Sequence, residues 1–334
     1  MSFELKMSKM LSKTNTKSIS GIVPYWKQSQ TPITDSQDIT LITVVYNETW
    51  SQFIDLVESW KGPVSAVLCT HPNQTLTTIS SDYHQIPTLH RHVTLHLAPS
   101  TLPENASRNL ARLYASTHHI LDATTNIVFS LDLRIRLLEN LMQYADMMAR
   151  GDMLVVPTFK KADGAKVVET RQGVLDLIEN GTVGLYDAHF ELNQGPTDVR
   201  QWRDSEDLYY YPVERYAMQY EPIVIQSKTV QPWCSERFLN KRSVCLLSDY
   251  LAGNDFKVLT FGWAMYQHDN ANPVSDLDNV LEKKIHIYFL IEQCIHHSRQ
   301  LDALGLWRTS QAIHIKTLCP GVLAKWGKKL IKHY

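Results

Sequence analysis

Two patterns of apolar residues alternate along this chain. One predicts strands, and the other predicts helices. Short runs of apolar, β-branched residues have the pattern of strands that are buried on both faces. Longer stretches place apolar residues three and four positions apart, as on one face of a helix. The expected strands are 39–45, 64–69, 93–98, 127–131, 153–157, 223–225 and 256–259. The expected helices are 52–60, 108–119, 137–149, 171–180, 277–290 and 321–334.

This alternation predicts an α/β fold, with a mostly parallel sheet flanked by helices. We expect a flexible leader at residues 1–37, which is rich in Ser, Thr, Lys and Gln. The α/β domain should span residues 38–275, and a C-terminal helical extension should span 276–334. The basic amphipathic end of that extension either packs on the protein or lies at a membrane surface. In open α/β sheets, ligand sites lie beyond the carboxyl ends of the strands.

Composition narrows the possible partners and locations. The 334 residues carry 33 Lys and Arg against 34 Asp and Glu, a net charge of -1. Because no basic stripe is present, nucleic acid is not an expected partner. No apolar run reaches the ~18–20 residues that span a bilayer. No signal peptide is visible in the first 30 residues, so a cytoplasmic protein and a lumenal one whose anchor is absent from this chain both stay open.

Cysteines and sequons bear on the compartment. The five cysteines are an odd number without metal-site spacing. They are either buried thiols or include one disulfide, for which Cys234–Cys245 is the candidate in a secretory protein. Four Asn-x-Ser/Thr sequons favour a lumenal location. They begin at Asn47, Asn73, Asn105 and Asn180.

Six short motifs, taken in order, resemble those of glycosyltransferase family 49. They are Trp60–Ser65, Pro103–Ala111, Phe129–Arg134, Val155–Phe159, Tyr220–Val224, and Arg237-Phe238 followed by Asn240-Lys241. The resemblance covers roughly residues 39–275. It implies a GT-A-like fold and inverting sugar transfer from a UDP-sugar donor with Mn²⁺. It further implies a glucuronosyltransferase-like enzyme of the Golgi lumen, with a glycan or glycoprotein as acceptor.

The resemblance places the family's Asp-x-Asp metal motif at Asp132-Leu133-Arg134, after the expected strand 127–131. Carboxylate oxygens suit Mn²⁺ or Mg²⁺, which neutralises the diphosphate leaving group. Asp132 is therefore a candidate for metal binding, donor binding and catalysis. Arg134 departs from the motif. Either its guanidinium pairs with phosphate in place of the metal, or it repels Mn²⁺ and activity is lost.

The segment Pro103–Ala111 opens a helix that faces the donor nucleotide in the family. Asn105 can cap this helix, and Arg108 with the first-turn N–H groups favours an anion. Asn105, Arg108 and Asn109 are accordingly the donor-binding candidates. The alternative is a capped structural helix that carries a surface arginine.

Two further roles come from the resemblance. The family's histidine near the end of the domain falls on Tyr266, so His268 is the candidate metal ligand after a short slip. A surface histidine is the alternative. Inverting transfer also needs a carboxylate base. Glu221 is our choice because it follows an aromatic residue and precedes Pro222, and Glu236 and Asp249 are the alternatives.

Two functions from different classes remain at this stage. The first is a UDP-sugar-dependent inverting glycosyltransferase. The second is a degenerate family member that binds a glycan or protein partner without catalysis. The departures from the family at Arg134, Ser235 and Tyr266 favour the second.

Overall fold

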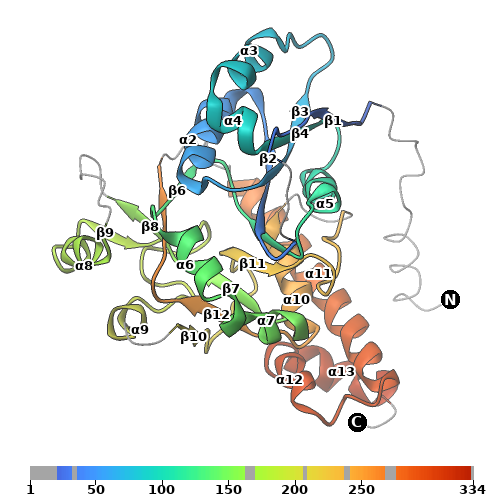
Figure 1. Ribbon diagram of the computed structural model, residues 1–334. Helices are drawn as coiled ribbons and strands as arrows, with labels where there is room; N and C mark the ends of the chain where they lie inside the picture. Colours follow the sequence, from blue (N-terminus) through green and yellow to red (C-terminus); the bar gives the residue numbers. More distant parts are fainter. Residues whose placement is uncertain are drawn as a thin grey trace.

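A nine-stranded sheet lies at the centre of the computed structural model, which describes residues 21–31, 36–161, 170–205, 209–236, 241–267 and 276–331 (Figure 1). The strand order is β1-β4-β3-β2-β5-β11-β7-β12-β10. The strands are β1 (Val23–Lys27), β2 (Ile39–Val45), β3 (Val64–Thr70), β4 (Val93–Pro99), β5 (His119–Asp122), β7 (Met153–Val156), β10 (Tyr210–Pro212), β11 (Ile223–Ser227) and β12 (Phe256–Leu259).

Helices cover both faces of the parallel strands β4, β3, β2 and β5 (Figure 1). On one face lie α2 (Trp50–Trp60), α3 (Thr77–Gln85) and α4 (Pro87–His92), and on the other lies α5 (Glu104–Tyr114). Leu41 and Val45 pack in the cluster that contains α2, whereas Ile42 and Val44 pack with α5. Successive residues of a strand point to opposite faces. A strand between two layers of helix is therefore apolar at nearly every position, as 39–45 is.

The sheet is mixed, whereas we expected it to be mostly parallel. Besides the four strands above, only β7 and β12 pair in parallel among the described strands of this large sheet. Strand β11 runs antiparallel between β5 and β7, and both edge strands, β1 and β10, are antiparallel to their neighbours. The chain reaches β11 through a second sheet and not through a single crossover helix, so the connection imposes no parallel direction. The predicted α/β class with flanking helices is confirmed.

The second sheet lies beside the first and has the order β6-β13-β8-β9. Its strands are β6 (Ile127–Phe129), β13 (Ala264–Tyr266), β8 (Thr158–Lys161) and β9 (Val183–Leu185). Helices α8 (Arg171–Glu179) and α9 (Val199–Asp204) pack against it, with Trp202 fully buried against Phe159. The strand expected at 127–131 is therefore β6, which pairs antiparallel with β13 and not with the parallel strands.

Two expected helices differ from those observed. The helix expected at 108–119 is α5, which begins at Glu104 and ends at Tyr114, so that the residues after it are free to form β5. The helix expected at 137–149 is divided into α6 (Leu133–Glu139) and α7 (Leu141–Arg150). Gly151 ends α7 with a φ of 106°, a left-handed conformation that glycine adopts readily.

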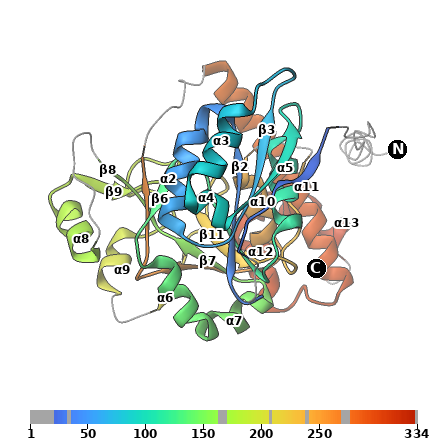
Figure 2. The same cartoon turned by 45° about the horizontal axis from the view of Figure 1, so that its top comes forward.

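The predicted C-terminal helical extension is confirmed. Helices α11 (Asp276–Ala303), α12 (Ile313–Leu318) and α13 (Pro320–Leu330) form a third apolar cluster with α10 (Arg242–Leu251). A disulfide between Cys294 and Cys319 joins α11 to the residue that precedes α13, a pairing that we did not predict. These helices and the second sheet lie on opposite sides of the molecule (Figure 2).

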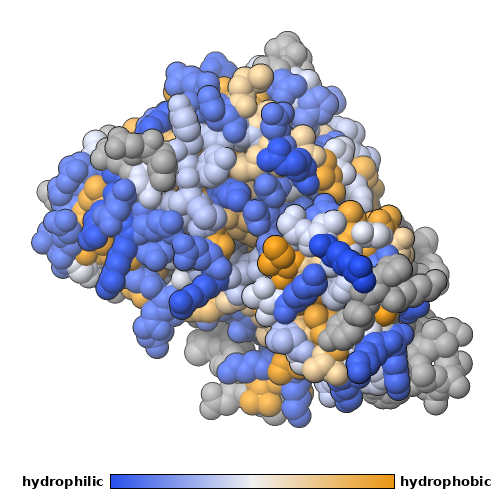
Figure 3. Space-filling model, turned by 90° about the horizontal axis from the view of Figure 1, so that it is seen from below, coloured by the Kyte–Doolittle hydropathy of each residue, from blue (hydrophilic) through white to orange (hydrophobic). Residues whose placement is uncertain are grey.

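The face that carries these C-terminal helices is largely hydrophilic, and its hydrophobic residues lie in separate small groups (Figure 3). None of the helices in the described part of the chain is both long and apolar enough to cross a membrane.

The expectation of a flexible leader at residues 1–37 is wrong for Val23–Lys27, which forms strand β1 at the edge of the large sheet. Its Tyr25 ring contacts His96 and Tyr114, with ring centroids 5.1 and 5.2 Å apart. These aromatic contacts explain why a segment in a polar region is ordered as a strand. Residues 1–20 and 32–35 lie outside the described residues.

Candidate functional site

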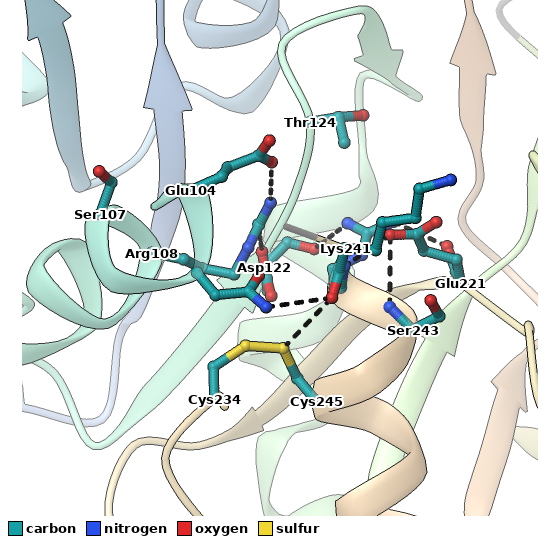
Figure 4. Close-up of polar contacts among 12 residues, drawn as sticks. Glu104, Ser107, Arg108, Asp122, Thr124, Glu221, Cys234, Lys241, Ser243 and Cys245 are labelled. Carbon is teal, nitrogen blue, oxygen red and sulfur yellow. Dashed lines mark hydrogen bonds and ion pairs between the residues drawn. A yellow bond between two sulfur atoms is a disulfide. The ribbon is translucent and has the colours of Figure 1, made fainter. Parts of the chain in front are cut away.

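The carboxyl ends of the parallel strands meet at one edge of the large sheet, and acidic and basic side chains gather there (Figure 4). Asp122 is the last residue of β5, and its backbone pairs with Ile42 of β2. Helix α5 begins five residues after β4, which brings Glu104 and Arg108 to the same edge. Strand β11 runs the opposite way, so Glu221, two residues before its start, also lies there.

Arg108 is the central cation of this edge. One guanidinium nitrogen is paired with Asp122 Oδ1, and the other lies 2.9 Å from Glu104 Oε1. Burial alone would lower the pKa of Arg108, but the charges of Asp122, Glu104 and Glu221 outweigh it and raise that pKa. The guanidinium therefore stays charged, and its two described partners are both carboxylates.

Glu221 lies on the other side of the edge and caps helix α10. Its Oε1 accepts hydrogen bonds from the backbone N–H groups of Arg242 (2.7 Å) and Ser243 (3.3 Å). Its Oε2 lies 3.1 Å from His189 Nε2. Burial raises the pKa of Glu221. The His189 hydrogen bond and the charges of Arg242, His189 and Arg108 together outweigh burial and lower this pKa to about 2.

A carboxylate with so low a pKa is a weak proton acceptor near neutral pH. The proposed role of Glu221 as catalytic base stays a prediction, and its hydrogen bonds give it a structural role as well. The alternative Asp249 is buried beneath the edge in α10, where burial raises its pKa to about 8.

Asn105 and Asn109 face inward from α5 and hold the segment that leads to α10. The Asn105 side-chain amide donates to the carbonyls of Ser235 (2.9 Å) and Lys241 (3.3 Å). Asn109 donates to the Cys234 carbonyl (2.9 Å) and accepts from the Cys234 N–H (3.1 Å). These contacts agree with the alternative of a structural helix. These hydrogen bonds do not test whether Asn105 and Asn109 contact a donor, so that contact stays a prediction.

A disulfide reinforces the same wall of the site. Cys234 is joined to Cys245 of α10, the pairing that we had considered (Figure 4). Beneath it, the buried Arg112 of α5 donates to the backbone carbonyls of Lys228, Gln231 and Pro232. Segment 228–236 is therefore fixed to α5 by hydrogen bonds and to α10 by a covalent bond.

Asp132 and Arg134 lie elsewhere, and their expected position at a carboxyl end of the parallel sheet is wrong. Asp132 is half exposed at the start of α6, and its carboxylate is 3.6 Å from the Arg136 guanidinium. Arg134 pairs with Asp38 at 2.6 Å and lies against Gly62. Asp38 directly precedes β2, and Gly62 lies two residues before β3. Arg134 is thus near the amino ends of β2 and β3, and Asp132 follows β6 of the second sheet.

The physical reason is the missed strand β5. Its four residues, His119–Asp122, begin at the last residue of the helix that we expected at 108–119, whereas the observed helix ends at Tyr114. The chain then leaves the large sheet, and β6 joins the second sheet before Asp132. The signal that would have found the site is the apolar pair Ile120-Leu121 followed by Asp122, after the break in helical pattern at 115–117.

The described residues at this edge do not fit a divalent metal. No group of three His, Cys, Asp or Glu side chains suited to a metal occurs in the described ranges. Asp122 is engaged by Arg108, and the residue two positions on is Thr124, whose hydroxyl donates to Asn126 Oδ1 at 2.7 Å. The predicted metal ligand His268 lies outside the described residues.

Comparison of the sequence with family models gives one match. Residues 98–276, more than half of the chain, match the family described as a glycosyl-transferase for dystroglycan. The matched region contains α5, β5, β11 and α10, the elements that form the edge described above. A search of the curated proteins found no match.

Solved structures of glycosyltransferases are similar in fold at low identity. S. aureus TarS is 13% identical, with a TM-score of 0.42 over 89% of this chain and 44% of that chain. S. aureus TarS 1-349 in complex with UDP-GlcNAc is 14% identical, with a TM-score of 0.43 over 87% and 92%. GalNAc-T7 with UDP, GalNAc and Mn²⁺ is 8% identical, with a TM-score of 0.48 over 89% and 58%. The chain thus spans less than half the length of the complete TarS chain.

Proposed function

This chain belongs to glycosyltransferase family 49, and from that premise we propose that it transfers a sugar from a nucleotide-sugar donor to a glycan or glycoprotein acceptor. The observation that carries the proposal is the position of Asp122. It ends β5 at the carboxyl edge of the parallel strands, beside the start of α5. Ligands of open α/β sheets bind at such an edge. The donor site therefore centres on Asp122 and Arg108 in place of Asp132 and Arg134.

The finer parts of the proposal rest on family membership. We propose a UDP-sugar donor, a glucuronosyltransferase-like specificity and inversion at the anomeric carbon. An inverting step requires a base that takes the proton of the acceptor hydroxyl. The low pKa of Glu221 disfavours it for this step, so the base is better sought among side chains that the acceptor would contact.

A lumenal location, in the Golgi, is also proposed. Two disulfides support it, since such bonds persist in oxidising compartments and are rare in the cytosol. Three exposed sequons are consistent with the same compartment.

A non-catalytic role is the second candidate, and one observation favours it specifically. Arg108, the buried cation of the edge, is already paired with two carboxylates. A diphosphate would have to compete with Glu104 for it. In that case the chain would bind a glycan or protein partner without transferring a sugar.

Calorimetric titration with UDP and UDP-glucuronate distinguishes these two functions. We expect wild type to bind, Asp122→Asn to lose at least tenfold in affinity, and Asp132→Asn to bind like wild type. Asp132 is the matched control because it is a half-exposed aspartate that follows β6 of the second sheet and not β5. If wild type binds neither ligand, the transferase proposal fails and the non-catalytic role stands. If Asp132→Asn lowers the affinity and Asp122→Asn does not, the donor site lies at Asp132 and not at Asp122.

A further inference from the structure

Two carboxylates at the carboxyl edge share one guanidinium. Glu104 Oε1 and Asp122 Oδ1 bind different nitrogens of Arg108, so the side chain lies between them (Figure 4). Arg108 and Asp122 each have 5% of their side chain exposed, and Glu104 has 33%. A carboxylate as buried as Asp122, with a second carboxylate close by, requires a positive charge as its partner. In this chain the charge comes from the protein itself.

We infer that Arg108 occupies the place of a divalent cation at this edge, and that the chain binds its nucleotide donor without Mn²⁺. The inference rests on the proposed function, whose site it describes more closely. The planar guanidinium presents donors that match carboxylate and phosphate oxygens. When the donor binds, Arg108 Nη2 releases the partly exposed Glu104 and pairs with a phosphate oxygen. Nη1 stays paired with the buried Asp122.

The other acidic groups of the edge are already engaged. Glu221 accepts from the start of α10, and Asp187 accepts from the backbone N–H groups of His189 and Glu221. Glu282 is paired with the Lys241 ammonium group. A metal ion that approached Asp122 would find no second free carboxylate among these residues, and it would face the charge of Arg108. Two positive charges beside the same buried carboxylate repel each other strongly, because little water screens them.

The residue two positions after Asp122 gives a second, independent indication. Thr124 stands where a second metal-binding carboxylate would be needed, and its hydroxyl is a weaker ligand for a hard cation than a carboxylate. That hydroxyl also donates a hydrogen bond to Asn126, which lies in the same loop between β5 and β6. Guanidinium and threonine together make a site for an anion and not for a cation.

Manganese binding by the wild-type protein is the direct test. The electron paramagnetic resonance signal of free Mn²⁺ should be undiminished by stoichiometric protein at about millimolar metal. Affinity for UDP should also agree within about twofold in chelator and in Mn²⁺. Stoichiometric uptake of Mn²⁺ that Asp122→Asn abolishes would overturn the inference, and so would a UDP affinity that rises at least tenfold with Mn²⁺. If UDP does not bind at all, the proposed function fails, and the manganese signal alone decides whether the edge is a metal site.

Removal of the guanidinium should create a metal site. Arg108→Met leaves Glu104 and Asp122 without their cation, and we expect this variant to take up Mn²⁺ where wild type does not. Arg108→Lys keeps a positive charge and is the matched control, in which no uptake is expected. Uptake by both variants, or by neither when both are folded, would contradict the view that Arg108 stands in for the metal. If Arg108→Met does not fold, the wild-type measurements still decide.

Discussion

At the scale of single residues, the buried carboxylate of Glu221 links the edge of the sheet to the start of α10. Two backbone N–H groups and His189 stabilise its charged form. A carboxylate at a helix start also interacts favourably with the helix dipole. The result is a pKa of about 2 in the folded protein against an ordinary value of 4.5.

This lowered pKa predicts how stability depends on pH. Because the folded-state pKa lies below the unfolded value, Glu221 stabilises the fold above pH 4.5, and the contribution is lost as pH falls towards 2. We expect Glu221→Gln to lower the free energy of unfolding by about 3 kcal/mol at pH 7. The gap to wild type should close between about pH 4.5 and pH 2, as followed by urea denaturation.

The exposed Glu191 supplies a control, because Glu191→Gln should change stability little at any pH. A wild-type advantage over Glu221→Gln that stays constant down to pH 2 would show that the carboxylate's charge is not the stabilising feature.

Asp122 and Asp132 show how far single residues could be placed from the sequence. Both follow short apolar runs, so both satisfied the pattern of an acidic residue at a strand end. What separates them is the strand's partner: β5 pairs with β2, whereas β6 pairs with β13, about 135 residues away in the chain. Local periodicity carries no information on such long-range pairing. Arg108 was identified as a site residue, but its two carboxylate partners were not.

At the scale of elements, α5 holds the wall of the site through Arg112. Its guanidinium donates to three backbone carbonyls of segment 228–232 at distances between 2.7 and 2.9 Å. Without it, these acceptors, of which the Gln231 carbonyl is buried, would lose their partner. We expect Arg112→Met to lower the free energy of unfolding by about 2–4 kcal/mol. Hydrogen exchange in segment 228–236 should rise at the same time.

The exposed Arg203 is the comparison, since its described side-chain hydrogen bonds go to the neighbouring Asp204. Arg203→Met should leave the free energy of unfolding close to that of wild type. Equal effects of the two substitutions would mean that the carbonyl contacts of Arg112 contribute nothing.

Long, regular elements were predicted well from periodicity, and short ones were not. The seven-residue strand 39–45 was placed at its observed limits, because it is buried along its whole length and rich in apolar residues. Strand β5 has four residues and β1 has a proline in its five, so neither offers a repeat long enough to recognise. Their order comes from pairing with neighbours that are distant in sequence.

At the scale of the whole molecule, the C-terminal helices form a unit with its own apolar cluster and its own disulfide. The bond between Cys294 and Cys319 closes a loop with a sequence separation of 25. A disulfide that closes a loop of this length stabilises the folded protein by about 3 kcal/mol. We expect the double variant Cys294→Ser, Cys319→Ser to lose about this much stability.

The loss should be local, and hydrogen exchange can locate it. Protection should fall in α12 and α13 but not in β2 and β3, which belong to separate clusters. An equal fall in both regions would show that the helices and the sheet unfold as one unit.

The buried amide of Asn105 has a consequence for how this chain would mature in the lumenal compartment that we propose for it. Its side-chain nitrogen donates to two carbonyls of the site wall, and Ser107, which completes the sequon, is fully buried. An oligosaccharide on that nitrogen would replace one of its hydrogens and could not fit inside the fold. Folding of α5 and modification of Asn105 therefore exclude each other, while the exposed Asn47, Asn73 and Asn180 can carry glycans after the chain has folded.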